Sequence, residues 1–117
     1  MDLFDPTQNL LGAALRGAAA RQSALAQNLA NANTPGYQRV DVDFHSVLRN
    51  AAAAGDETAG VAFDAQADDA AQMRLDGGTV DVDREAAELA ANGLEYQALV
   101  AVANGRIAII QSALGVR

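Results

Sequence analysis

The chain has 117 residues, contains no cysteine and carries a formal net charge of −7. This composition excludes a disulfide framework, a zinc finger and a thiol nucleophile, and it argues against nucleic acid as a partner, because binding to phosphates needs clusters of basic residues. Half of the residues are hydrophobic but only 4% are aromatic, so a single domain over residues 1–117 has few large side chains for its core, and burial against other chains is the natural compensation.

A first helix is predicted over about residues 6–33. Asp5 suits the N-cap, Pro6 suits the first helical position, and Gln8 stands where the partner in a capping box would be. Apolar side chains then recur in steps of four and three residues, as expected for a helix that buries one face in a coiled-coil seam. This stripe, with one polar interruption, consists of Leu11, Leu15, Ala18, Gln22, Leu25, Leu29 and Ala32.

A turn signal follows in the stretch QNLANANTPGYQ, residues 27–38. Pro35 and Gly36 suit the two central positions of a type II turn, in which glycine supplies the positive φ angle, and Tyr37 follows the turn. Proline also disfavours helical geometry in the residue before it, Thr34. The first helix is therefore expected to stop just ahead of this turn.

Two asparagines, Asn28 and Asn31, precede that stop. In one interpretation they terminate the helix, because asparagine side chains bond nearby backbone groups and tolerate left-handed geometry. In the other, they make fixed hydrogen bonds to another backbone at the end of the helix pair. The residues alone leave both interpretations open.

The middle of the chain is a variable arm over about residues 34–80. It begins with a short helix for which Asp43 is the expected cap. Residues 51–75 contain few large apolar side chains, so burial cannot offset the entropy of ordering them, and a flexible or weakly ordered segment is expected. Gly77 and Gly78 then indicate a turn ahead of a short extended piece.

A second, longer helix is predicted over about residues 82–115, with Asp81 or Asp83 as its N-cap. At 1.5 Å per residue, a helix of roughly 30 residues would be about 45 Å long, which exceeds the usual length in globular proteins and indicates a coiled coil or a helical repeat. Its apolar stripe again steps by four and three residues and consists of Val82, Ala86, Leu89, Gly93, Tyr96, Val100, Ala103, Ile107, Ile110 and Leu114.

The two stripes predict a mainly α fold in which two long terminal helices pair as a coiled coil, joined by a short helix and a flexible or weakly ordered middle segment. An antiparallel hairpin within one chain satisfies this pattern. Leu99, Val102 and Ile109 lie off the main seam, so additional contacts with further chains along the outer flank remain a second interpretation. The expected packing sets Leu11, Leu15, Leu25 and Leu29 against Tyr96, Val100, Ile107 and Ile110, with Leu89 and Leu114 extending the seam.

No group of residues indicates catalysis or metal binding. His45 is the only histidine, and a catalytic or ligand role usually needs partners, so a surface position is expected. The acidic pairs Asp41 with Asp43 and Asp81 with Asp83 do not fit the spacing of a calcium-binding EF-hand loop and are better explained by helix capping. The sequence therefore predicts a structural protein with no catalytic, metal or cofactor site, and not an enzyme.

The sequence also predicts no membrane insertion. No apolar run is long enough to span a bilayer. The opening MDLFDPTQN lacks the basic region and apolar stretch of a secretory signal peptide. Any route out of the cytoplasm would therefore be one that does not read such a signal.

The stretch LAQNLANANTPGYQRVDVDF, residues 25–44, resembles the N-terminal motif of the bacterial flagellar rod and hook axial proteins. Leu29 stands where isoleucine is frequent in that family. Pro35 and the following DVDF resemble the proximal rod member of the family. Residues 76–100 resemble the same member, with Gly78 in the place of a frequent asparagine. The positions that match the first motif are Ala26, Asn28, Leu29, Ala30, Asn31, Thr34, Gly36 and Tyr37.

This resemblance implies a structural subunit of the flagellar basal-body rod, the drive shaft that crosses the periplasm and carries torque from motor to hook. The terminal helices of such subunits pair as a coiled coil and pack side by side in a helical tube. The implied partners are other rod subunits, the adaptor protein between rod, membrane ring and export gate, and the flagellar type III export apparatus. The motif around Asn28, Asn31 and residues 34–37 would fix the hinge into the arm.

The same apolar stripes are compatible with two alternative functions. One is another rod protein of the same family, and the other is a cytoplasmic coiled-coil adaptor or export chaperone. A rod subunit is expected in purified basal bodies, whereas an adaptor or chaperone is expected to stay in the cytoplasm.

Overall fold

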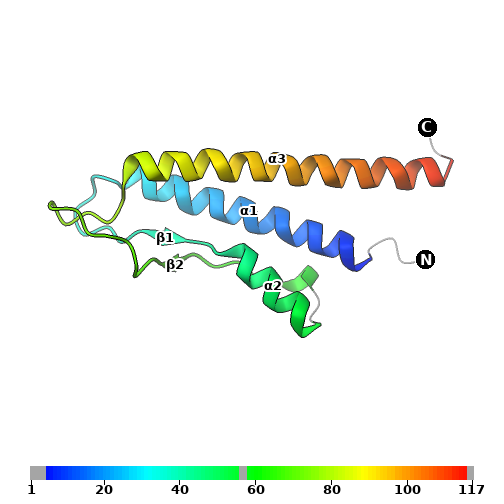
Figure 1. Ribbon diagram of the computed structural model, residues 1–117, viewed down its shortest axis with the longest axis horizontal. Helices are drawn as coiled ribbons and strands as arrows, with labels where there is room; N and C mark the ends of the chain where they lie inside the picture. The colour runs from blue at the N-terminus through cyan, green and yellow to red at the C-terminus, as the bar shows by residue number, and fades with distance from the viewer. Residues whose placement is uncertain (1–4, 56–57, 116–117) are drawn as a thin grey trace.

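Helices dominate the computed structural model, which describes residues 5–55 and 58–115. The molecule measures 61 × 31 × 15 Å and has a radius of gyration of 17.5 Å, whereas a compact domain of this length has about 13 Å. The mainly α fold with two long terminal helices is confirmed, and its shape is elongated (Figure 1). The elements are α1 (Pro6–Ala30), β1 (Val40–Asp41), α2 (Phe44–Ala54), the 3-10 turn η1 (Thr58–Gly60), β2 (Gln66–Ala67) and α3 (Val82–Ala113).

Each helix begins at an aspartate that bonds the free N–H groups of its first turn. Asp5 accepts a hydrogen bond from Gln8 N at 2.8 Å, and Asp43 accepts one from Ser46 N at 3.2 Å. Asp81 caps α3 in the same way, so the predicted caps are confirmed. The reciprocal half of the capping box at α1 does not form, because Gln8 Oε1 has no hydrogen-bond partner.

α1 ends at Ala30, somewhat earlier than expected, and Asn31 is its C-cap. The turn that follows has the predicted form. Tyr37 N donates to the Thr34 carbonyl at 3.2 Å, and Gly36 has a φ angle of +75°, as the third residue of a type II turn requires. The chain therefore leaves the helix at once and reverses toward β1.

α1 is the middle layer, with α3 on one side and the segment of β1 and α2 on the other (Figure 1). α1 and α3 run antiparallel, and three polar contacts set their register. Asn28 Nδ2 donates to Glu85 Oε1 at 2.7 Å near one end, and Arg106 bonds Asp5 at 3.0 Å near the other. Between them, Asn92 Nδ2 donates to a backbone carbonyl of α1 at 2.9 Å.

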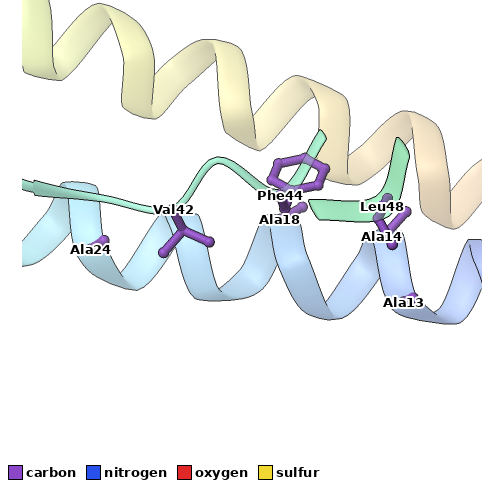
Figure 2. Packing of buried hydrophobic residues seen from close by; sticks show 7 residues of the cluster. All are labelled: Ala13, Ala14, Ala18, Ala24, Val42, Phe44 and Leu48. Atoms are coloured by element: carbon purple, nitrogen blue, oxygen red, sulfur yellow. The ribbon is translucent and has the colours of Figure 1, made fainter. Parts of the chain in front are cut away.

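The apolar core lies between α1 and the chain that runs from β1 into α2. Small residues of α1 let this chain come close: a Cβ on Gly17 would lie 2.5 Å from Phe44 Cβ. Figure 2 shows Val42, Phe44 and Leu48 placed along the alanines of α1. The buried cluster consists of Ala13, Ala14, Ala18, Ala24, Val42, Phe44 and Leu48.

The buried face of α1 is rotated from the predicted stripe. Of the four leucines expected in the seam, Leu25 is buried, while Leu11, Leu15 and Leu29 are half-buried. Small side chains occupy the buried face of α1 because only they allow the arm to pack closely against this helix. The buried residues of α1 are Ala13, Ala14, Gly17, Ala18, Ala24, Leu25 and Asn28.

On α3 the fully buried side chains are polar, Glu85 and Asn92. Ile107 and Ile110 lie past the contact with Asp5, where α3 projects beyond the start of α1, so they do not meet the α1 leucines as expected (Figure 1). Within the predicted stripe, Leu89, Val100 and Ile110 are half-buried, whereas Tyr96, Ile107 and Leu114 are 40%, 45% and 62% exposed.

The middle segment folds back on β1, which the sequence did not predict. Val40 pairs with Ala67 and Asp41 with Gln66 in an antiparallel register. Strands of two residues are too short to show an alternating hydrophobic pattern. Within the predicted middle segment, residues 51–54 belong to α2 and residues 61–75 contain β2 and turns, while the expected weak order of residues 51–75 stays a prediction.

Gly17→Ala should destabilise the protein by about 1–3 kcal/mol, because the added methyl group overpacks the contact with Phe44. The measurement is the free energy of unfolding from a urea titration followed by circular dichroism. Gly12→Ala is the matched control, since nothing lies within 4 Å of its added methyl group. That substitution should stabilise α1 by roughly 0.5–1 kcal/mol, and equal effects at both positions would contradict the close packing at Gly17.

Candidate functional site: a polar hinge and an uncovered helix face

Asn28 is fully buried, and every polar atom of its amide is used. Its Nδ2 donates to the Val40 carbonyl at 2.6 Å and to Glu85 Oε1 at 2.7 Å. Its Oδ1 accepts from Val40 N at 3.0 Å and from the Tyr37 hydroxyl at 2.9 Å. The amide thus pairs with the Val40 backbone as a neighbouring strand would, which supports the interpretation of fixed bonds to another backbone.

A buried ion pair lies beside this amide. Arg39 Nε donates to Glu85 Oε2 at 2.8 Å, and the two side chains are 6% and 1% exposed. Thr79 Oγ1 accepts from Arg39 N at 2.8 Å and donates to the Tyr37 carbonyl at 3.0 Å. Glu85 therefore receives both a guanidinium and an amide, which offset the desolvation of its charge.

Two arginines extend this arrangement across four segments of the chain. Arg39 also bonds Asp68 at 2.8 Å, in the turn after β2. Arg21 bonds Asp41 at 3.0 Å and Glu88 at 2.7 Å, which joins α1 to β1 and α3. We call the following set the hinge cluster: Asn28, Tyr37, Arg39, Thr79 and Glu85, with Arg21, Asp41, Asp68 and Glu88 around them.

Burial and charge act in opposite directions within the hinge cluster. Burial alone would raise the pKa of Asp41, but the bonds from Arg21 and a backbone N–H, with the charges of Arg21 and Arg39, hold that pKa below its ordinary value. Burial, and then the charge of Glu85, raise the pKa of the Tyr37 hydroxyl. Burial would lower the pKa of Arg39, yet its carboxylate partners raise it, so its guanidinium stays charged.

The remaining motif residues act at the end of α1. Asn31 Nδ2 donates to the Gln27 carbonyl at 2.9 Å, and Thr34 Oγ1 donates to Asn31 Oδ1 at 3.1 Å. Pro35 and Gly36 are exposed at the tip of the turn. Asn31 therefore fits the interpretation as a helix terminator. Asn28 fits the interpretation of fixed hydrogen bonds to another backbone, so the two asparagines have different structural roles.

Sequence reasoning missed the pairing of Arg39 with Glu85. The two residues are 46 positions apart, and no local pattern connects them. One signal was available: Glu85 and Asn92 are one heptad apart, beside the apolar stripe of α3. A carboxylate on an inward-facing helix position needs a cationic partner from elsewhere in the chain.

His45 lies at the surface, as expected, and joins α2 to α3. Its imidazole pairs with Glu95, and its side chain is 49% exposed. The ring also stacks on Phe44 at a centroid separation of 4.1 Å. His45 therefore holds the two helices together across the outer end of the core.

Each acidic pair singled out in the sequence includes a residue with a structural role. Asp41 bonds Arg21, and Asp43 and Asp81 cap helices. Among the described residues, no three His, Asp or Glu side chains are arranged to hold a metal ion. No helix within residues 5–55 and 58–115 combines the length and apolarity that crossing a membrane would need.

Opposite its packed face, α3 presents an uncharged surface to solvent. Residues at steps of four and three form a second seam there, and all of them are exposed. Leu94 within it is 68% exposed, and the adjoining Val102 and Ile109 are 52% and 71% exposed. An exposed apolar face opposite a packed face is typical of a helix that has neighbours on both sides. We call this the outer seam: Ala87, Ala91, Leu94, Ala98, Ala101, Gly105, Ala108 and Ser112.

A groove of about 590 Å³ opens between α1, α2 and α3. Arg49 of α2 and Arg106 of α3 line it, together with the His45–Glu95 pair. Its walls are otherwise mainly aliphatic, and the principal residues are Leu10, Leu11, Leu48, Leu99 and Val102. We call it the three-helix groove.

Known proteins with similar sequences share one description. A family profile described as flagella basal body rod protein matches residues 10–38. The flagellar basal body rod protein FlgB of Salmonella typhimurium (strain LT2) is 40% identical over 116 residues, which cover 83% of this chain and 84% of the relative. FlgB of Escherichia coli K12 is 36% identical, covering 92% and 91%. FlgB of Bacillus subtilis 168 is 32% identical, covering 97% of both chains.

Asn28→Ala should destabilise the protein by about 2–4 kcal/mol, because the Val40 backbone groups and the buried Glu85 lose a partner. The measurement is the free energy of unfolding in urea. Asn33→Ala is the matched control in the same motif, since Asn33 is exposed, and its effect should stay within about 0.5 kcal/mol. Similar values for the two variants would contradict the role of the buried amide.

Asp41→Asn should lower the free energy of unfolding at neutral pH and make that free energy less dependent on pH in the acidic range. The pKa of Asp41 is lower in the folded chain, so its contribution is present above the unfolded pKa of about 3.9 and is lost as pH falls through the folded value. Urea unfolding measured from pH 7 to pH 2 should therefore show a shallower decline for this variant. Asp69→Asn, at an exposed site in the arm, should reproduce the wild-type slope; a wild-type slope for Asp41→Asn would refute the ion-pair assignment.

Proposed function

The chain belongs to the FlgB family of flagellar basal body rod proteins, and we propose that it assembles by packing its terminal helices against those of neighbouring subunits. As a member of this family it is a structural component of the rod in the flagellar basal body and serves motility. One observation supports the proposed mode of assembly above others. The outer seam of α3 is uncharged and exposed along about seven helical turns of a single chain.

Small residues in the outer seam favour close helix packing. Alanine and glycine let a partner helix approach, and the alternation of four and three residues matches a coiled-coil interface. Leu94, Val102 and Ile109 supply the larger aliphatic surface, at roughly 25 cal/mol for each Å² removed from water. Because the core of a single chain is built largely from alanines, contacts between subunits would add substantially to its stability.

The hinge cluster is the proposed path for torque between the arm and the helix pair. Arg39 ties the arm to α3 through Glu85, and Asn28 ties the same strand to α1. The Arg39–Glu85 contact is short and buried, so the arm cannot rotate without breaking a charged hydrogen bond. A rotational load applied to the arm would therefore pass into the two long helices.

We further propose the setting of this rod subunit. The rod crosses the periplasm, and the subunit reaches it by the flagellar type III export apparatus without a cleaved signal peptide. Its partners are other rod subunits and the adaptor that links the rod to the membrane ring and export gate. The composition fits this route, since an alanine-rich chain without cysteine has no disulfide to close and little bulk to hold it folded during transit.

Leu94→Asp should abolish swimming and remove the chain from the rod, because it places a charge in the outer seam. The measurement is soft-agar motility of cells that depend on the variant, with immunodetection of the chain in purified basal bodies. Leu94 is 68% exposed in the single chain, so the purified variant should keep the wild-type circular dichroism spectrum and urea midpoint. The loss would then arise from assembly and not from folding.

Leu75→Asp is the control for this experiment. Leu75 is fully exposed in the turn before α3, away from the outer seam, so this variant should swim normally. Normal swimming by cells that carry Leu94→Asp would refute assembly through this face.

A further inference from the structure

The last two turns of α3 project past the start of α1 (Figure 1). This α3 overhang, residues 107–114, contains no charged residue and is about 12 Å long at 1.5 Å per residue. Ile107, Ile109 and Leu114 within it are 45%, 71% and 62% exposed. A single molecule therefore carries an apolar projection that its own described helices do not cover.

The three-helix groove opens beside the base of this projection. Its α3 wall runs over residues 95–106, about 18 Å, so it is long enough to receive the α3 overhang. Leu10 and Val102 on its walls are 37% and 52% exposed. Projection and groove thus match in length and in aliphatic character, and both lie toward the same end of the molecule.

Charge also favours this match. The C-terminal end of a helix carries a partial negative charge on its free carbonyls. Within Val82–Ala113 the last turn of α3 contains no basic residue, and Arg117, which suits this dipole by its place in the sequence, lies outside the described residues. The groove offers Arg49 on its α2 wall, whereas Arg106 on its α3 wall is already paired with Asp5. In a chain of net charge −7, an uncharged overhang and a groove wall that carries Arg49 avoid the repulsion between acidic surfaces of two copies.

We propose that the α3 overhang of one subunit docks in the three-helix groove of a second copy of this chain. The second copy lies parallel to the first and is displaced along the long axis by about 15 Å, the distance between the midpoints of overhang and groove. Ile109 then contacts Leu10 and Val102 of the neighbour, and the end of α3 faces its Arg49. Because the two surfaces are unlike, the contact repeats from copy to copy without closing, as a shaft requires.

This inference rests on the proposed function, and disulfide cross-linking in basal bodies tests it. The chain has no cysteine of its own, so the double variant Leu10→Cys with Ile109→Cys introduces the only pair. It is co-produced with the unaltered chain, so that the rod still forms, and the isolated basal bodies are oxidised with copper phenanthroline. We expect a ladder of dimers and larger oligomers of this chain on non-reducing gels, lost on reduction, with the 10–109 disulfide identified by mass spectrometry.

Leu10→Cys with Leu94→Cys is the matched control. Leu94 is as exposed as Ile109 and lies on the same helix, but it is outside the α3 overhang, so at least tenfold less 10–94 disulfide is expected. Equal yields from the two pairs overturn the docking, as does a closed dimer without larger species, which indicates a two-fold contact. No 10–109 disulfide in basal bodies that contain the variant overturns the docking alone, whereas absence of the unaltered chain from basal bodies refutes the rod function itself.

Discussion

A carboxylate buried at the start of α3 constrains the rest of the molecule. Glu85 is 1% exposed, and an unpaired charge at that depth would destabilise the fold by several kcal/mol. Its partners come from elsewhere: Asn28 from α1 and Arg39 from the position just before β1. The chain must therefore bring these three segments together where α3 packs. The path of the arm follows from this requirement, and Phe44 then comes to lie on the glycine and alanines of α1.

The distribution of side chains differs from that of an ordinary globular domain, although Phe44 and Leu25 are buried. Inside, alanines and Gly17 meet buried polar groups such as Asn92, whereas Leu94 and Ile109 face outward. A monomer that worked alone would gain little from this arrangement, because its largest aliphatic surface stays in water. For a member of a rod family the arrangement is sensible. The interior fixes the geometry of one subunit, and the exterior holds the apolar area that neighbouring subunits can bury.

Local features could be predicted from the sequence because short-range chemistry determines them. The cap at Asp43, the positive φ of Gly36 and the extents of the long helices all follow from neighbouring residues. The apolar stripe was less informative, since it favoured large side chains and the arm selects small ones. The ion pair of Arg39 with Glu85 joins residues 46 positions apart, so no periodicity reveals it. For Asn28 the sequence left two roles open, and only the position of β1 decides between them.

The three polar contacts between α1 and α3 determine how the helix pair responds to a sliding force. Asn28, Asn92 and Asp5 each bond a partner across the interface, at the two ends and in the middle. Sliding one helix past the other by a single turn, about 5.4 Å, would separate all three pairs at once and leave two of them buried without partners. The two helices therefore cannot slide past each other in small steps. They resist sliding until all three contacts break together.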